Sequence, residues 1–266
     1  MVIDFHTHVF PDKIAANTLR KLSDKSGGIR PVFDGTPAGL VRHMEYGNTD
    51  LSVVLNIATN ARQQKSVNDF AIEINNEYRG ALIAFGSIYP FSPDATEELD
   101  RIAGAGIKGI KFHPEYQDFF VDDERLFPLY ERIADYKLIT VFHAGADIGH
   151  PKPIRCTPRR LERILPYFRG SPVVAAHFGG YISWDEVEEC LVGRDVYLDT
   201  SFCYARIPIF QANAIVRAHT PERILYGSDL PWSDDSGEKR LVGYLDVSAE
   251  ERELIFSGNA MRILTL

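Results

Sequence analysis

Eight short apolar runs recur along the 266-residue chain, and stretches with helical periodicity separate them. Many of the runs are almost continuously apolar, which indicates strands buried on both faces of a parallel sheet. We expect strands at residues 2–9, 51–57, 82–88, 106–114, 137–145, 171–180, 195–201 and 223–232. Eight such units without a linker predict a single α/β domain over residues 1–266, a (β/α)8 TIM barrel. An open doubly wound sheet is the alternative.

The charge of the chain limits its partners. The formal net charge is −8 and the pI is near 5.5, so neither nucleic acid nor an anionic membrane surface is an expected partner. Three widely spaced cysteines and the lack of a signal-peptide pattern favour a reduced, cytoplasmic protein. We therefore expect a small-molecule substrate, and the sequence leaves open a homodimer.

The first apolar run contains two histidines, His6 and His8, with one residue between them. Side chains alternate along a strand, so both would point to the same face, with Cα atoms roughly 6.6–6.8 Å apart. Two imidazoles at that spacing can bind one metal ion, although ordinary strand residues show the same pattern.

Polar residues also end several of the other expected strands. His113 follows the fourth run, His143 the fifth, His177 the sixth and Asp229 the eighth. In a barrel the carboxyl ends of the strands form the active-site face, so these side chains are expected to meet there. The chain has no glycine-rich phosphate loop and no Gly-x-Ser-x-Gly turn, which argues against the nucleotide-binding and serine-hydrolase classes.

These motifs, taken in order, resemble the amidohydrolase superfamily, in particular the branch of metal-dependent hydrolases that includes amino-carboxymuconate-semialdehyde decarboxylase. The segments that carry the resemblance span almost the whole chain: residues 4–8, 109–114, 142–145, 176–180, 223–231 and 258–260. The resemblance implies one divalent metal per chain, most often zinc, bound by His6, His8, His143 and Asp229.

The resemblance also implies roles beside the metal. His177 would act as an acid/base residue, and Asp229 would accept a proton from a water activated by the metal. Some members of the superfamily hold two metals bridged by a carbamylated lysine, and Lys111 lies near that position. In that alternative His143 and His177 would both bind the second metal.

The leading functional hypothesis is a metal-dependent hydrolase acting on a small, carboxylated ester, lactone or amide. The alternative is a metal-dependent decarboxylase, a carbon–carbon lyase, of an aromatic or unsaturated carboxylic acid. A barrel with only a structural zinc is a third hypothesis, which the complete set of strand-end residues disfavours. Candidate substrate contacts lie in the expected active-site loops or at strand ends: Lys111, His113, Arg155 and Trp232. Arg155 could pair with a carboxylate through both guanidinium nitrogens.

Overall fold

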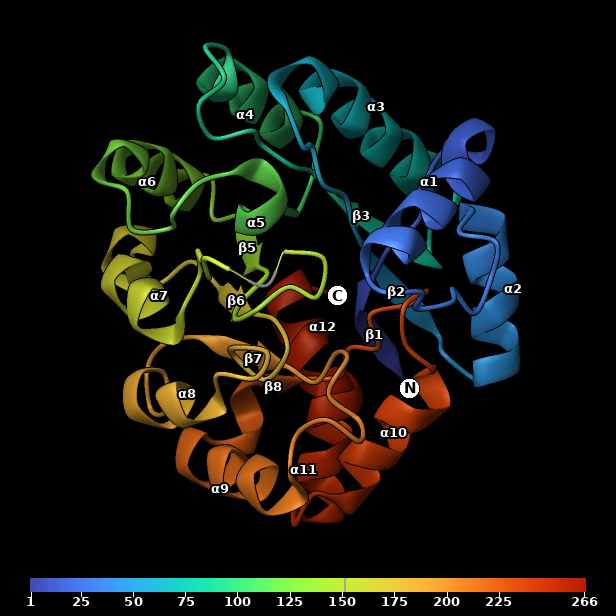
Figure 1. The fold of residues 1–266 in the computed structure, drawn as a ribbon, viewed down its shortest axis with the longest axis vertical. Helices are drawn as coiled ribbons and strands as arrows, with labels where there is room; N and C mark the ends of the chain where they lie inside the picture. Colours follow the sequence, from blue (N-terminus) through green and yellow to red (C-terminus); the bar gives the residue numbers. More distant parts are fainter. Residues whose placement is uncertain (151) are drawn as a thin grey trace.

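A computed structural model describes residues 1–150 and 152–266. Its strands are all parallel and form two sheets in the orders β1-β2-β3 and β4-β5-β6-β7-β8. Backbone hydrogen bonds link Gly86, after β3, to β4, and link β1 to the segment after β8. The strands lie at the centre with the helices around them (Figure 1), as the TIM barrel prediction requires. The strands are β1 (Ile3–Thr7), β2 (Leu51–Leu55), β3 (Leu82–Phe85), β4 (Gly109–Phe112), β5 (Ile139–Phe142), β6 (Val173–Ala175), β7 (Tyr197–Asp199) and β8 (Ile224–Leu225).

Helices follow the strands in the expected alternation. The longer ones are amphipathic, with their apolar side chains against the strands, as the periodicity predicts. The α-helices, long and short, are α1 (Asp12–Lys25), α2 (Pro37–Gly47), α3 (Ala61–Glu77), α4 (Ala95–Gly104), α5 (Pro114–Gln117), α6 (Phe127–Asp135), α7 (Pro158–Ile164), α8 (Trp184–Cys190), α9 (Ile209–His219), α10 (Asp235–Tyr244), α11 (Ala249–Glu253) and α12 (Asn259–Leu264). In the described residues, no helix is both long enough and apolar enough to span a membrane.

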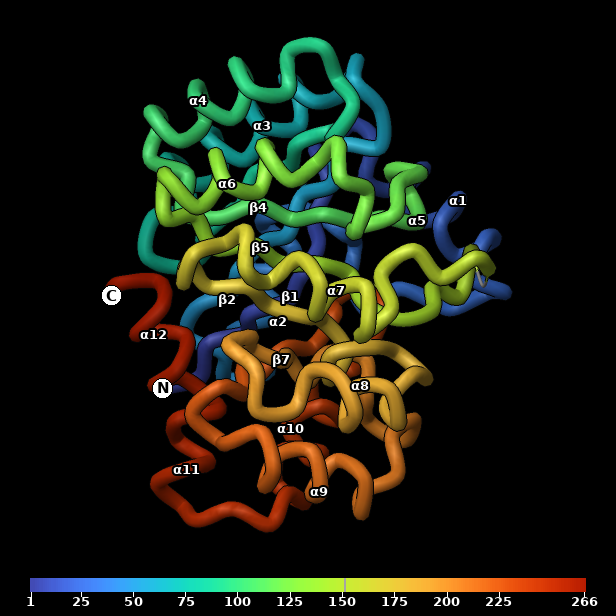
Figure 2. The backbone as a smooth tube through the Cα atoms, turned by 90° about the vertical axis from the view of Figure 1, so that its left-hand side faces the viewer, coloured from blue at the N-terminus to red at the C-terminus, as the bar shows by residue number. Residues whose placement is uncertain are grey.

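Two cores hold the barrel together. The larger packs helices against the outside of the strands, and the smaller fills the interior with residues such as Phe5, Phe85 and Val141. Ala260 and Leu264 of α12 join the interior core, so this last helix closes one end of the barrel. Both termini lie at that end, and α1 and α5 lie at the other (Figure 2). The carboxyl ends of the strands therefore face the end that α12 does not cover.

Several strands are shorter than the apolar runs predicted. β8 covers only Ile224–Leu225 and β6 only Val173–Ala175, so the polar residues that follow lie in loops rather than on strands. The register of β1 against β2 also shifts between Asp4 and Thr7. Such an irregularity redirects side chains. It lets Phe5 pack in the interior while the next residue, His6, reaches the site described below.

Candidate active site

A cavity of about 620 Å³ opens at the carboxyl ends of the strands. Of the predicted site residues, Arg155 is not in its lining. The others all line it, and they are His6, His8, Lys111, His113, His143, His177, Asp229 and Trp232. The histidines are no more than 9 % exposed, and Lys111 is fully buried. Residues from the ends of five strands or the loops after them therefore meet in one place, as the barrel prediction requires.

His6, His8 and Asp229 form the tightest cluster in this cavity. Oδ1 of Asp229 lies 3.1 Å from Nε2 of His8 and 3.4 Å from Nε2 of His6. The Nδ1 atom of each imidazole, on the side of the ring away from Asp229, makes a hydrogen bond that fixes the ring. Nδ1 of His8 lies 2.9 Å from the carbonyl oxygen of Leu55, and Nδ1 of His6 lies 2.8 Å from Oδ2 of Asp199. The ligand atoms of this trio all lie within 4.8 Å of one another.

This arrangement fits a divalent cation. A carbonyl oxygen can only accept, so Nδ1 of His8 carries its proton, and a neutral His8 turns the lone pair of Nε2 toward the carboxylate. Two acceptors 3.1 Å apart need a proton or a cation between them. Burial lowers the pKa of His6 to about 3, and the ammonium of Lys111 acts in the same direction, so this imidazole is neutral. Neutral imidazoles and a carboxylate are the donors that zinc and related first-row ions prefer.

His177 and His143 form a second hydrogen-bonded pair beside the first cluster. Nδ1 of His177 lies 3.0 Å from the carbonyl oxygen of Ser201, so it donates, and Nε2 is left to accept. Nδ1 of His143 lies 3.0 Å from that Nε2 and must supply the proton. Nε2 of His143 is then a buried lone pair, and it has no partner among the described residues. A cation would satisfy it.

The structure groups His143 differently from the sequence prediction. Its nitrogen lies with His113 and Asp147 in one candidate cluster, whereas the described residues place His6, His8 and Asp229 in another. The ring of His143 stacks on that of His113, with centroids 4.1 Å apart. Three of the four predicted ligands are thus brought together, and the fourth lines the same cavity with a free nitrogen.

Lys111 lies at the floor of the site. Its Nζ is 3.2 Å from Nε2 of His6, and burial lowers the pKa of the amine to about 8, against the opposing effect of Asp199 and Asp229. Burial raises the pKa of Asp229, but the contacts with His8 and His6 lower it more, so this carboxylate is ionised. The lysine can therefore pair with Asp229 or with an incoming carboxylate.

Asp199 is a site residue that the sequence reasoning missed. It ends β7 and is fully buried. Its Oδ2 accepts from Nδ1 of His6, and its Oδ1 accepts from the backbone N–H of His177 at 3.0 Å and of Ser201 at 3.1 Å. Ser201 Oγ also lies 3.0 Å from Nδ1 of both His6 and His177. A polar residue at the end of the seventh strand was the available signal.

Arg155 does not lie where the sequence predicted. Its guanidinium pairs with Asp118 at 2.5 Å and lies over the ring of Phe120, outside the set of residues that line the cavity. Its backbone N–H donates to Oε1 of Glu115, so the residue anchors its loop to α5. The structure therefore does not bring Arg155 to the cavity with the other predicted residues, and its contact with a substrate carboxylate stays a prediction.

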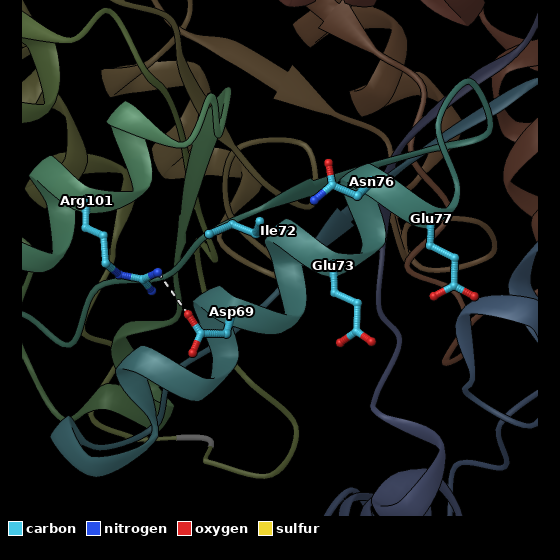
Figure 3. A pocket seen from close by; sticks show the side chains of 6 residues that line it. All are labelled: Asp69, Ile72, Glu73, Asn76, Glu77 and Arg101. Carbon is cyan, nitrogen blue, oxygen red and sulfur yellow. Dashed lines mark ion pairs between the residues drawn. The ribbon is translucent and has the colours of Figure 1, made fainter.

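A second hollow lies on the outer surface, along α3 and α4 (Figure 3). Its residues are Asp69, Ile72, Glu73, Asn76, Glu77 and Arg101. Arg101 pairs with Asp69 at 2.9 Å, and Lys65 contacts the same carboxylate at 2.7 Å. These groups balance charges on the surface of two helices, and the lining offers no imidazole or thiol for chemistry.

Comparisons with known proteins agree with the fold. An uncharacterised TIM-barrel protein of Bordetella bronchiseptica superposes with a TM-score of 0.78 at 19% identity, covering 99% of this chain and 98% of that one. 5-Carboxyvanillate decarboxylase of Sphingomonas paucimobilis gives 0.74 at 15% identity, covering 100% and 99%. Dihydroxybenzoic acid decarboxylase of Polaromonas, solved with bound manganese and the inhibitor 2-nitroresorcinol, gives 0.71 at 15% identity, covering 100% and 97%.

The family is shown by the sequence itself. A search of curated proteins finds no match. The family model described as amidohydrolase, however, matches residues 3–266, which is nearly the whole chain. The strand-end histidines and Asp229 lie inside that match, in the order that the resemblance predicted. On this evidence the chain belongs to the amidohydrolase family.

Proposed function

We propose that this chain is a metal-dependent decarboxylase of a carboxylic acid, the alternative that the sequence left open, rather than the hydrolase it favoured. The observation that carries the proposal is the placement of a buried polar cluster under apolar and aromatic cavity walls, including Tyr181, Phe202 and Trp232. A carboxylate that leaves as CO₂ loses its localised charge, so a site that excludes water favours the step. The two decarboxylases of similar fold support the same choice.

His6, His8 and Asp229 would hold the metal, with the free nitrogen of His143 in the same cavity. When bound, a divalent cation would supply positive charge that polarises oxygens of the substrate. The proposed metal is a divalent first-row ion. Manganese is bound in one decarboxylase of similar fold, and zinc is the ion that the sequence favoured. The donor set of two imidazoles and one carboxylate accommodates either ion.

The protein residues divide the remaining tasks. Lys111, at the floor of the cavity, would pair with a negatively charged group of the substrate. As the bond to the carboxyl carbon breaks, its electron pair stays on the substrate carbon and takes up a proton, and CO₂ leaves. His177 is the candidate proton carrier, because its ring is held by Ser201 and its Nε2, a lone pair in the resting site, lies beside His143 in the cavity. Nε2 first takes up a proton from solvent, which gives an imidazolium, and then delivers this proton to the substrate carbon, which returns the ring to its neutral form.

The test is a panel of acids on protein loaded with manganese or zinc. 2,6-Dihydroxybenzoate and 5-carboxyvanillate are the first probes, and CO₂ release is followed with and without a chelator. In D₂O the product should carry one deuterium on the carbon that bore the carboxyl group, which NMR detects. Chelator-sensitive hydrolysis of esters or lactones, with no CO₂ from any acid, would replace the proposal by the hydrolase.

A further inference from the structure

The cavity extends well beyond the polar cluster. Its volume of about 620 Å³ lies in the range of pockets that hold ligands of drug size, and its lining continues away from the histidines along α1 and α3. These two helices follow β1 and β2, the strands next to His6 and His8. The extension is therefore continuous with the site of the proposed reaction.

One face of α1 forms a wall of the extension. Ile14, Thr18 and Leu22 line the cavity, and their spacing of four residues places them in one row on the helix. Leu19, on the neighbouring face, is buried, with 5 % of its surface exposed. Ile14 is 49 % exposed although it is apolar. Its side chain is thus directed to an open cavity and not to the protein interior.

The row on α3 has a similar character. Val67 and Phe70 line the cavity, with Gln63 and Ser66 beside them. Among the described residues of α1 and α3 that line it, Lys13 is the one charged side chain. An apolar chain lying between these rows would be removed from water without displacing any buried ion pair. A highly charged extension would find one charged partner on these two helices, Lys13.

We propose that the substrate is an amphiphilic carboxylic acid, whose carboxyl end lies at the histidines and whose alkyl or aryl extension lies between α1 and α3. The position of the carboxyl end rests on the proposed function, whereas the subsite for the extension can be tested by binding alone. The driving force is the removal of apolar surface from water, which grows with each methylene that enters the subsite.

The test uses 2-hydroxybenzoates that carry linear alkyl chains of increasing length at the 4, 5 or 6 position of the ring. Calorimetry on the metal-loaded protein gives Kd, and CO₂ release is measured in parallel. We expect Kd in at least one series to fall by roughly fourfold per methylene until the subsite is filled. Equal Kd values along all three series would overturn the proposal.

Two matched variants test whether the alkyl chain of the ligand binds against α1. Ile14→Glu puts a carboxylate on the cavity wall, and Ala16→Glu puts the same charge on the exposed outer face of α1. Ile14 lies in the first turn of α1, where an acidic residue is favourable, and Ala16 is exposed in the next turn, where glutamate is a good helix former. Both variants should therefore fold, which thermal denaturation checks. Ile14→Glu should abolish most of the dependence of Kd on chain length, and Ala16→Glu should retain it. An unchanged dependence in Ile14→Glu, or an equal loss in both, would overturn the proposal.

The outcomes also separate this inference from the proposed function. Binding that tightens with chain length, without CO₂ release from any acid, would support the subsite and defeat the decarboxylase. CO₂ release from short acids, with no effect of chain length on Kd, would defeat the subsite and leave the decarboxylase standing.

Discussion

Asp199→Asn tests the claim that the protein sets the protonation of its metal-binding nitrogens. Oδ1 of Asp199 accepts from two backbone N–H groups and from Ser201 Oγ, so in the variant the amide oxygen will occupy this position. The amide NH₂ then faces Nδ1 of His6, 2.8 Å away in the wild type, and donates to it. The proton of His6 moves to Nε2, the atom that the cation needs.

The expected cost follows from the two ways to restore the lone pair. If the amide turns around, three hydrogen bonds that the oxygen accepts are lost, at about 1 kcal/mol each. If the amide keeps its orientation, His6 keeps its proton on Nε2, which is the wrong tautomer for binding the metal. Loss of a partner that orients a metal ligand typically weakens metal binding by about 10–100-fold, or about 1.4–2.7 kcal/mol. Competition with a chelator of known affinity measures the metal Kd, and thermal denaturation of the metal-free protein shows whether the fold is intact.

Ser201→Ala is the matched control for this variant. It removes the hydroxyl that Oδ1 accepts from but leaves the carboxylate against His6. Its metal Kd should stay close to that of the wild type. If Asp199→Asn folds normally and its metal Kd lies within about twofold of the wild-type value, then the carboxylate does not set the tautomer of His6 and the reasoning is refuted.

Three further predictions concern the acid/base residue, a ligand and the buried carboxyl of Glu238. His177→Asn should retain the metal and lose about 10²–10⁴-fold in CO₂ release, and loss of metal would refute its placement beside the ion. His6→Ala should lose most of its metal in elemental analysis, and full retention would exclude it as a ligand. Burial raises the pKa of Glu238 to about 8 from 4.5, against hydrogen bonds from Ser233 and two backbone groups. The folded state therefore holds the extra proton, and its stability falls as pH rises from about 4.5 to 8. Glu238→Gln should gain stability relative to the wild type over that range in urea unfolding, and a constant difference would contradict this.

The barrel and most of the site could be predicted because they depend on local patterns. Apolar runs buried on both faces are visible in sequence, and so is their alternation with helices. The barrel then fixes where the strand ends meet, which brings His6, His8, His177 and Asp229 together without any knowledge of loops. The prediction for these residues needed only that each follow an apolar run.

The rest depends on contacts between distant residues. Arg155 pairs with Asp118, 37 positions away, so its position in the loop did not reveal its direction. Asp199 was overlooked because its strand was treated as an apolar run, and its role appears only from the contact with His6, 193 residues earlier. Helix α10 buries Asp235 and Glu238 beside Leu241 and Val242, so polar side chains interrupt the apolar face by which an amphipathic helix is identified in a sequence.

The backbone at the strand ends explains why alternation along a strand is a poor guide to these side chains. His177, Phe178 and Asp229 adopt φ values of 61°, 55° and 70°, in the left-handed region that costs about 1–2 kcal/mol for residues other than glycine. The conformation is held by hydrogen bonds from their N–H groups to Oδ1 of Asp199, to its carbonyl oxygen and to the carbonyl oxygen of His6. Asp199 thus orients the imidazole of His6 and also holds the turn at His177 and Phe178, and the carbonyl group of His6 holds the turn at Asp229. Since the same atoms orient the imidazoles and the backbone, the site behaves as one coupled unit, and the effects of substitutions within it will not add.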